Sequence, residues 1–200
     1  QYAEGKDMRS AGDRKAVAVL MCDLRDFSGI SETMDPSDVA RMLNTYFDHV
    51  VKAIEAHGGM VDKFIGDAVM AVFGLLEEEE HPARAAVRAA VEIRSALEAA
   101  NAENQARGLP RLDNGIGIHY GDVIASYLGS SNRLEFTVVG STVNIAARLE
   151  SLAKSPNPPL IISEDVADIV KDSFTVFGGK LTTLKGVGEK KVYSIREVRW

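Results

Sequence analysis

Residues 60–74, MVDKFIGDAVMAVFG, restrict the possible folds of this chain most strongly. Two apolar runs are interrupted at their centre by Gly66 and Asp67. Apolar runs separated by a two-residue loop that contains Gly are typical of an antiparallel hairpin with a tight turn. The continuous apolar run AVAVLMC at 16–22 predicts a further, buried strand. The chain therefore contains a sheet, and a carboxylate lies at the tip of one of its hairpins.

Two long segments have the pattern of helices. Residues 35–59 repeat apolar side chains every three or four positions, with Asp35 as N-cap, Pro36 at the first helical position and Gly58 just beyond the end. An Ala-rich amphipathic helix is expected over 82–108. Strands and helices thus alternate along the chain, which indicates an α/β or α+β sheet covered by helices.

The second half of the chain predicts shorter elements. We expect a turn GSSNR between two strands, a helix capped by Thr142, a break at SPNPP, and a strand followed by a short helix. Two strands close the chain. The expected strands are 115–128, 134–139, 160–163, 174–178 and 192–198, and the expected helices are 142–153 and 164–170.

The composition excludes several classes of protein. The chain has 200 residues, enough for one domain, and a net charge of -6 argues against a binder of duplex nucleic acid. Cys22 is the only cysteine, which excludes an internal disulfide and fits a reducing compartment. No apolar stretch approaches the ~18 residues of a membrane span. We expect a linker or arm at 1–15, a domain at 16–200, no membrane contact by this segment and a cytoplasmic location. A membrane anchor or an upstream regulatory domain could lie outside the sequence.

Asp23 and Asp67 are candidate metal ligands. Asp23 ends an apolar strand, where a carboxylate is costly unless it is paired, hydrated or bound to a cation. If that strand lies beside the hairpin, the two acids converge and can hold a pair of hard cations such as Mg²⁺. The Leu24 carbonyl can add a ligand, and Phe27 and Ser28 begin a loop whose backbone N–H groups can hold phosphate. The alternative is two solvated acids in turns.

Several motifs now occur in a fixed order: CDLRDFS, GGMVDKFIGDAVMAVFG, GIGIHYGDV, FTVVGSTVNIAARLE and LKGVGEKKVY. Together they resemble the catalytic domain of the class III nucleotidyl cyclases over residues 16–198. The resemblance implies an α+β fold (an α/β sandwich) with a ferredoxin-like βαββαβ core sheet covered by helices and a C-terminal extension. It also implies that the chain cyclises a nucleoside triphosphate to a 3′,5′-cyclic nucleotide and pyrophosphate.

The resemblance assigns roles to individual residues. Asp23 and Asp67 match the aspartates that hold two divalent cations per site, Mg²⁺ with Mn²⁺ or Ca²⁺ as alternatives. Lys63 and Thr137 match the pair that contacts the purine base.

The remaining matched residues bind the sugar and the phosphates. Asn144 matches a residue that orients the ribose, Arg148 one that stabilises the transition state, and Lys185 one that binds the terminal phosphates. Asn144 and Arg148 are four positions apart, so both can reach one ligand from one face of a helix.

Lys63 and Thr137 favour ATP over GTP. An ammonium group only donates hydrogen bonds, so it suits the acceptor N1 of adenine and opposes the N1–H donor of guanine. A threonine hydroxyl can accept from the 6-amino group of adenine, but because it can also donate it discriminates less.

Three positions depart from the family pattern. Asp26 stands where many members have Gly, Gly115 where some have a phosphate-binding Arg, and Ser28 where Thr is more usual. Asp26 could weaken polyphosphate binding or make an extra local contact.

The resemblance implies a homodimer with two shared sites. The aspartates of one chain would face the base, ribose and phosphate residues of the other, and both halves are present in this sequence. The alternatives are a guanylate cyclase, a diguanylate cyclase or polymerase-palm enzyme, a non-catalytic nucleotide-binding regulator, and a plain dimerisation module. His57, His119 and Cys22 are interpreted as structural residues.

Overall fold

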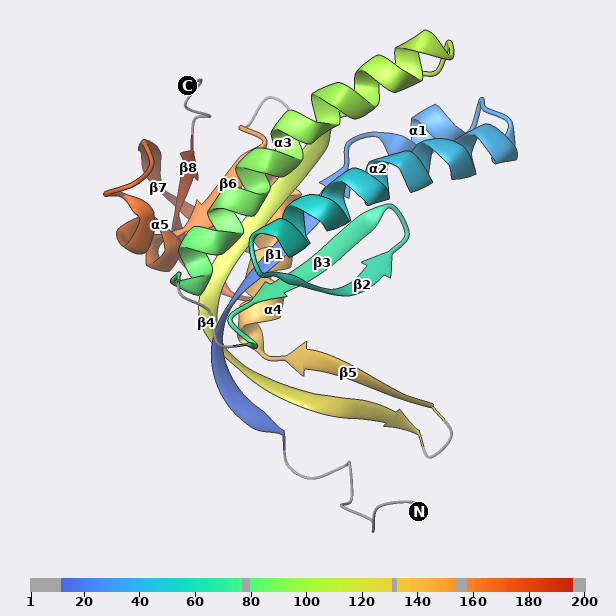
Figure 1. Cartoon of the computed structure of the whole chain (residues 1–200). Coiled ribbons are helices and arrows are strands. Elements are labelled where there is room, and N and C mark those ends of the chain that lie inside the picture. Colours follow the sequence, from blue (N-terminus) through green and yellow to red (C-terminus); the bar gives the residue numbers. More distant parts are fainter. Residues whose placement is uncertain (1–11, 77–79, 131–132, 154–157, 196–200) are drawn as a thin grey trace.

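The computed structural model describes residues 12–76, 80–130, 133–153 and 158–195 (Figure 1). Within these ranges, strands and helices alternate along most of the chain. The strands are β1 (Asp13–Leu24), β2 (Met60–Ile65), β3 (Ala68–Phe73), β4 (Asn114–Ser130), β5 (Arg133–Val139), β6 (Leu160–Ser163), β7 (Val176–Leu184) and β8 (Gly188–Ile195). The helices are α1 (Phe27–Ser31), α2 (Pro36–Ala56), α3 (Pro82–Ala106), α4 (Ser141–Leu152) and α5 (Glu164–Val170).

The described strands form one mixed sheet in the order β2-β3-β1-β4-β6-β8-β7, with β5 paired to β4 alone. The first four strands in this order, together with α2 and α3, form the expected ferredoxin-like βαββαβ core. β1 lies at the centre, antiparallel to both β3 and β4. β4 and β6 are parallel, and β6, β8 and β7 extend the sheet beyond the core.

Side chains of β1 alternate between two hydrophobic cores. Ala18, Leu20 and Cys22 lie in the larger core, which α2, α3 and α5 cover. Val17 and Val19 point to the opposite face and pack in a second core that includes Ala146 of α4. Figure 1 shows α2 and α3 together on one side of the sheet and α4 on the other. Because successive side chains of a strand point to opposite faces, this alternation also determines the face on which each polar side chain of β1 lies.

Local signals place α2 and the β2–β3 hairpin where the sequence predicts them. The Asp35 side chain accepts a hydrogen bond from the backbone N–H of Ser37, and Gly58 follows α2 with a φ of 72°. In the hairpin, Ile65 pairs with Ala68, so Gly66 and Asp67 form a two-residue turn.

Several expected boundaries were wrong. β1 begins at Asp13, inside the expected arm, because residues 13–15 pair with 123–125 of β4, and it continues through Asp23 to Leu24. The expected loop at Phe27 is the short helix α1.

The structure also corrects the expected start of α4 and the end of the chain. α4 is capped by Gly140, while Thr142 lies within the helix and donates its hydroxyl to the carbonyl of Asp122. The expected terminal strands are the longer hairpin β7–β8, and β8 also pairs with β6. Residues 1–11, the centre of the GSSNR turn, most of the SPNPP break and residues 196–198 lie outside the described residues.

Candidate functional site

Asp23 and Asp67 lie at the same end of the β1–β3 ladder. Cys22 pairs with Val69, so Asp23 is one residue and Asp67 two residues beyond the last described pair. Asp23 follows the alternation of Val17 and Val19, which places its side chain on the α4 face of the sheet. The predicted convergence of the two acids therefore agrees with the register of the central strands.

The Leu24 carbonyl points toward the β3 side of β1. The backbone N–H of Arg25 donates to the carbonyl of Asp113, at the start of β4, over 2.8 Å. In a trans peptide the C=O of one residue and the N–H of the next point in opposite directions. Leu24 therefore directs its carbonyl away from β4, to the side where β3 and the turn with Asp67 lie.

Helix α1 begins shortly after Asp23 and Leu24, two of the candidate metal ligands. Its N-cap, Asp26, has a left-handed backbone with φ 52° and ψ 26°, a conformation that Gly adopts freely and Asp tolerates. This conformation explains why a glycine suits the position. Phe27 is partly buried and packs against the larger core, whereas Ser28 is exposed. Phe27 therefore anchors α1 beside Asp23.

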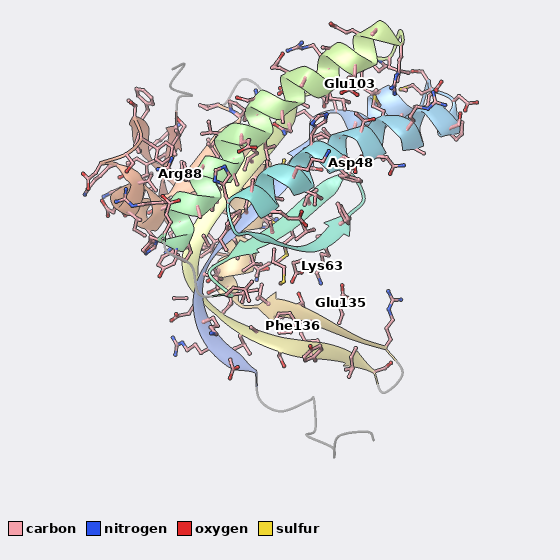
Figure 2. The ribbon with its side chains drawn as sticks, in the orientation of Figure 1. Asp48, Lys63, Arg88, Glu103, Glu135 and Phe136 are labelled. Atoms are coloured by element: carbon pink, nitrogen blue, oxygen red, sulfur yellow. The ribbon has the colours of Figure 1, made fainter. Side chains whose placement is uncertain are left out.

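Lys63 and Thr137 meet through a residue that the sequence interpretation missed. The Thr137 hydroxyl donates to Asp62 Oδ2 over 2.9 Å, and Lys63 Nζ lies 3.4 Å from the same oxygen. Lys63 Nζ also lies 3.9 Å from Glu135 of β5, and Figure 2 shows Lys63 and Glu135 close together on β2 and β5. The sequence offered one sign of Asp62: a carboxylate stands next to Lys63 in a strand that was predicted to be buried.

Lys63 occupies the same face of the sheet as Asp23. It pairs with Met70 of β3, and directly opposed residues of an antiparallel pair point to the same side. Met70 belongs to the core under α4. The base-binding candidate and the metal-binding candidate thus share the α4 face.

Helix α4 presents Asn144 and Arg148 to solvent. Both are exposed, while their neighbours Ile145 and Leu149 on the same helix are buried. The helix lies close to β4 at Gly117, where an added Cβ would come within 2.1 Å of the backbone nitrogen of Glu150. This approach fixes the position of α4, and with it the positions of Asn144 and Arg148.

Lys185 lies in the turn between β7 and β8 and is exposed. Its neighbour Leu184 is buried in a small cluster with Ile145 and Leu149 of α4, and Val187 packs against that cluster. The turn that carries Lys185 is therefore held beside the helix that carries Asn144 and Arg148.

Gly115 cannot be replaced by a larger residue without movement of the backbone. An added Cβ would lie 2.5 Å from the carbonyl oxygen of Ala153, at the end of α4. The close packing of α4 on β4 therefore leaves no room here for the arginine expected in some members of the family.

A partly buried ion-pair network joins the end of β1 to the end of α4. Arg25 donates to Asp113 over 2.9 Å and to the carbonyl of Ala153. Arg94 of α3 donates to the other carboxylate oxygen of Asp113 over 2.6 Å. Burial opposes ionisation of Asp113, but the bonds from Arg94 and Arg25 outweigh it and lower the pKa of the carboxyl group. Sequence reasoning missed this network, which spans distant parts of the chain.

The family is decided by comparison with known proteins. The sequence model of the adenylate and guanylate cyclase catalytic domain matches residues 10–197. The chain belongs to this family.

Solved cyclase domains share the fold. The adenylyl cyclase CyaB from P. aeruginosa has a TM-score of 0.88 at 28% identity, over 94% of this chain and 96% of that one. The guanylyl cyclase Cya2 has a TM-score of 0.86 at 34% identity, over 92% and 93% of the two chains. The cyclase family therefore includes close structural neighbours of both named specificities.

A curated relative is named for adenylate cyclase activity. The adenylate cyclase of Anabaena cylindrica is 38% identical over 170 residues, which are 83% of this chain and 33% of the relative. The chain spans about a third of the length of the curated relatives it matches.

The residues expected to be structural in this cyclase domain have structural partners. His119 Nδ1 lies 2.8 Å from the Ser163 hydroxyl, and His57 Nε2 lies 2.7 Å from a carboxylate oxygen of Glu92. Cys22 is fully buried, and burial raises the pKa of its thiol to about 12. Such a thiol is not a nucleophile at neutral pH.

The described ranges contain no group of three or more His, Cys, Asp or Glu side chains arranged to hold a metal. Among the same residues, no helix combines the length and apolar composition needed to cross a bilayer.

Proposed function

We propose that this chain is an adenylate cyclase domain that converts ATP to 3′,5′-cyclic AMP and pyrophosphate. The observation that carries the proposal is the common face of the sheet, on which Asp23, Lys63 and α4 lie together. The named activity of the Anabaena cylindrica relative supports the same reaction.

The reaction forms one bond and breaks another at the α-phosphorus of ATP. The ribose 3′-oxygen attacks the phosphorus, the bond to the β-phosphate breaks, and the 3′-hydroxyl proton is released. Asn144 holds the ribose, and Arg148, four residues along the same exposed helix face, lies against the phosphoryl oxygens. Charge on these oxygens rises as pyrophosphate leaves, so Arg148 stabilises the transition state more than the ground state. Lys185, beside α4, binds the terminal phosphates.

The acids fit a pair of divalent cations. Asp23, Asp67 and the Leu24 carbonyl supply only oxygen ligands, and hard cations such as Mg²⁺ prefer oxygen. Phosphate oxygens and water would complete the coordination. When bound, the cations lower the pKa of the 3′-hydroxyl and neutralise charge on the leaving group. Ser28 and the backbone of α1 lie next to this ligand set, with Phe27 as its anchor.

Lys63 and Thr137 read the base. The Lys63 ammonium donates to adenine N1, and Thr137 accepts from the 6-amino group. The arrangement around Asp62 supports this role, because it holds the two side chains together although β2 and β5 are not paired in the sheet.

A homodimer with two shared sites completes the proposal. Tyr127 of β4 and Phe136 of β5 lie directly opposite each other, with ring centroids 5.2 Å apart, and remain 43% and 38% exposed. Adjacent exposed aromatic side chains of this kind mark interaction surfaces. Asp23 and Asp67 of one chain would then face the base, ribose and phosphate residues of the other.

GTP is the second candidate substrate. The structural likeness to the guanylyl cyclase Cya2, at 34% identity, favours it. Lys63 opposes it, because an ammonium group would face the N1–H donor of guanine.

Product analysis tests these alternatives. The purified chain is incubated with ATP or GTP, each with Mg²⁺ or Mn²⁺, and cyclic nucleotide and pyrophosphate are quantified. We expect cyclic AMP from ATP, and loss of product in Asp67→Ala. Cyclic GMP as the sole product would overturn the assignment of the base. Bound nucleotide without any product would instead indicate a regulatory domain.

A further inference from the structure

Asp62 is a fully buried carboxylate beside the residues that read the base. Its side chain has 0% exposure, against 31% for Lys63. One carboxylate oxygen, Oδ2, accepts from Thr137 and lies 3.4 Å from Lys63 Nζ. The other, Oδ1, is buried without a hydrogen-bond partner among the described atoms.

A bulge in β2 brings Asp62 and Lys63 together. Successive residues of a regular strand point to opposite faces, which would separate the two side chains. The pairing register between β2 and β3 shifts between Val61 and Lys63, so Asp62 is the extra residue of the bulge. Bulges redirect side chains in this way and often occur near functional sites.

Stability alone does not account for this carboxylate. Burying a charged group is costly unless all of its hydrogen bonds are made, and Oδ1 makes none that the structure describes. A hydrophobic side chain at position 62 would avoid this cost. The contacts of Oδ2 therefore identify the function of the residue.

An ionised carboxylate can only accept hydrogen bonds, so Thr137 must donate its proton to Asp62. The lone pairs of the Thr137 oxygen then remain as acceptors for any further partner. We propose that Asp62 is a positioning residue that fixes Thr137 as a hydrogen-bond acceptor and so selects the 6-amino group of adenine over the 6-oxo group of guanine. The inference rests on the proposed function. It explains how a threonine hydroxyl, which on its own could either donate or accept, can distinguish adenine from guanine. Thr137 itself is only 7% exposed, so few water molecules compete to turn its hydroxyl.

The test compares wild-type chain with Asp62→Asn. Asparagine has the same shape, but its amide can donate as well as accept, so Thr137 is free to present its proton to a base. We expect the ratio of kcat/KM for ATP to that for GTP to fall about tenfold, the equivalent of one hydrogen bond. An unchanged ratio in a folded variant would overturn the inference.

Purine riboside triphosphate, which is ATP without the 6-amino group, isolates the contact with Thr137. We expect Asp62→Asn to change its kcat/KM less than about twofold, within the spread expected when no hydrogen bond is lost. An equal loss with ATP and with this analogue would show that Asp62 acts through Lys63 or through the fold, and would also overturn the inference.

Two variants separate the route through Thr137 from a general effect of charge. Glu135→Gln removes the other carboxylate near Lys63, which is 55% exposed, and should keep the ATP-to-GTP ratio. Thr137→Val removes the hydroxyl, and Asp62→Asn should add no further change to the ratio in that background. A further change of similar size in the double variant would contradict the coupling. If Asp62→Asn does not fold, Asp62→Ala provides the same comparison.

Measuring nucleotide binding without turnover separates the test of Asp62 from the test of the proposed reaction. The dissociation constants of ATP and GTP are measured for each variant without turnover. A wild-type chain that makes cyclic AMP, with an unchanged ratio in Asp62→Asn, would refute the role of Asp62 and leave the reaction intact. A wild-type chain without product, whose preference for binding ATP is lost in Asp62→Asn, would refute the reaction and support Asp62.

Discussion

Replacing Gly117 with alanine should push α4 away from the sheet. The added Cβ would lie 2.1 Å from the nitrogen of Glu150 and 2.5 Å from the carbonyl oxygen of Ala146. Both atoms belong to the backbone of α4, so no side-chain rotation can relieve the clash. The change therefore tests whether close packing at Gly117 sets the position of the helix.

The expected magnitude follows from these distances. Ordinary contact begins near 3.4 Å, so the helix and β4 must separate by more than 1 Å. Overpacking of a well-packed core typically costs about 1–3 kcal/mol, and we expect the upper end here because backbone must move. Because α4 carries Asn144 and Arg148, a shift of this size should also lower kcat about 100-fold.

Urea unfolding and the rate of cyclic AMP formation measure the two effects. Gly29→Ala is the matched control for stability, because no heavy atom lies within 4 Å of its added Cβ. Leu97→Ala, in α3 and 2% exposed, should cost about 2–5 kcal/mol without displacing α4. A Gly117→Ala variant that unfolds within about 0.5 kcal/mol of wild type would refute the packing argument. Full activity in a destabilised variant would refute the link to the site.

Three further predictions follow from the site and its surroundings. Arg148→Ala should lower kcat about 10²- to 10³-fold with little change in KM, because the side chain acts mainly in the transition state; steady-state kinetics would contradict this if KM rose instead. Asp67→Ala and Asn144→Ala chains should each be inactive alone and should regain activity when mixed, and a verified heterodimer without activity would argue against shared sites. Burial lowers the pKa of His119 below its usual 6.5, so the unfolded chain binds more protons and the free energy of unfolding should decrease as pH falls below 6.5 toward the folded pKa. Urea titrations from pH 7 to 5 should show that the free energy of unfolding depends less on pH in His119→Gln than in wild type. An unchanged pH dependence would exclude His119 as its cause.

Elements with local signals were predicted closely. Asp35 and Gly58 mark the two ends of α2, and the Gly66-Asp67 turn sets the register of β2 and β3. These features depend on contacts between residues a few positions apart, which the sequence displays directly. The ordered motifs likewise indicated the cyclase family, which the family match confirms.

Elements that depend on distant partners were missed or misplaced. β8 pairs with the distant strand β6 as well as with β7, and α4 begins at Ser141 with Gly140 as its N-cap, while Thr142 bonds to Asp122 of β4 instead of capping the helix. Neither β6 nor Asp122 is close in sequence to the element that it contacts, so local propensity cannot reveal the contact. Pairing with β4 likewise extended β1 into the expected arm.

The sequence by itself determined the local elements, the family and the types of residue available for chemistry. Only the tertiary structure decided which face of the sheet each side chain occupies and which distant groups meet. Asp62 and Thr137 are 75 positions apart and come together only because β2 is bulged and β5 folds back along β4. Such contacts depend on register and packing across the whole sheet, where a shift of one residue moves a side chain to the opposite face.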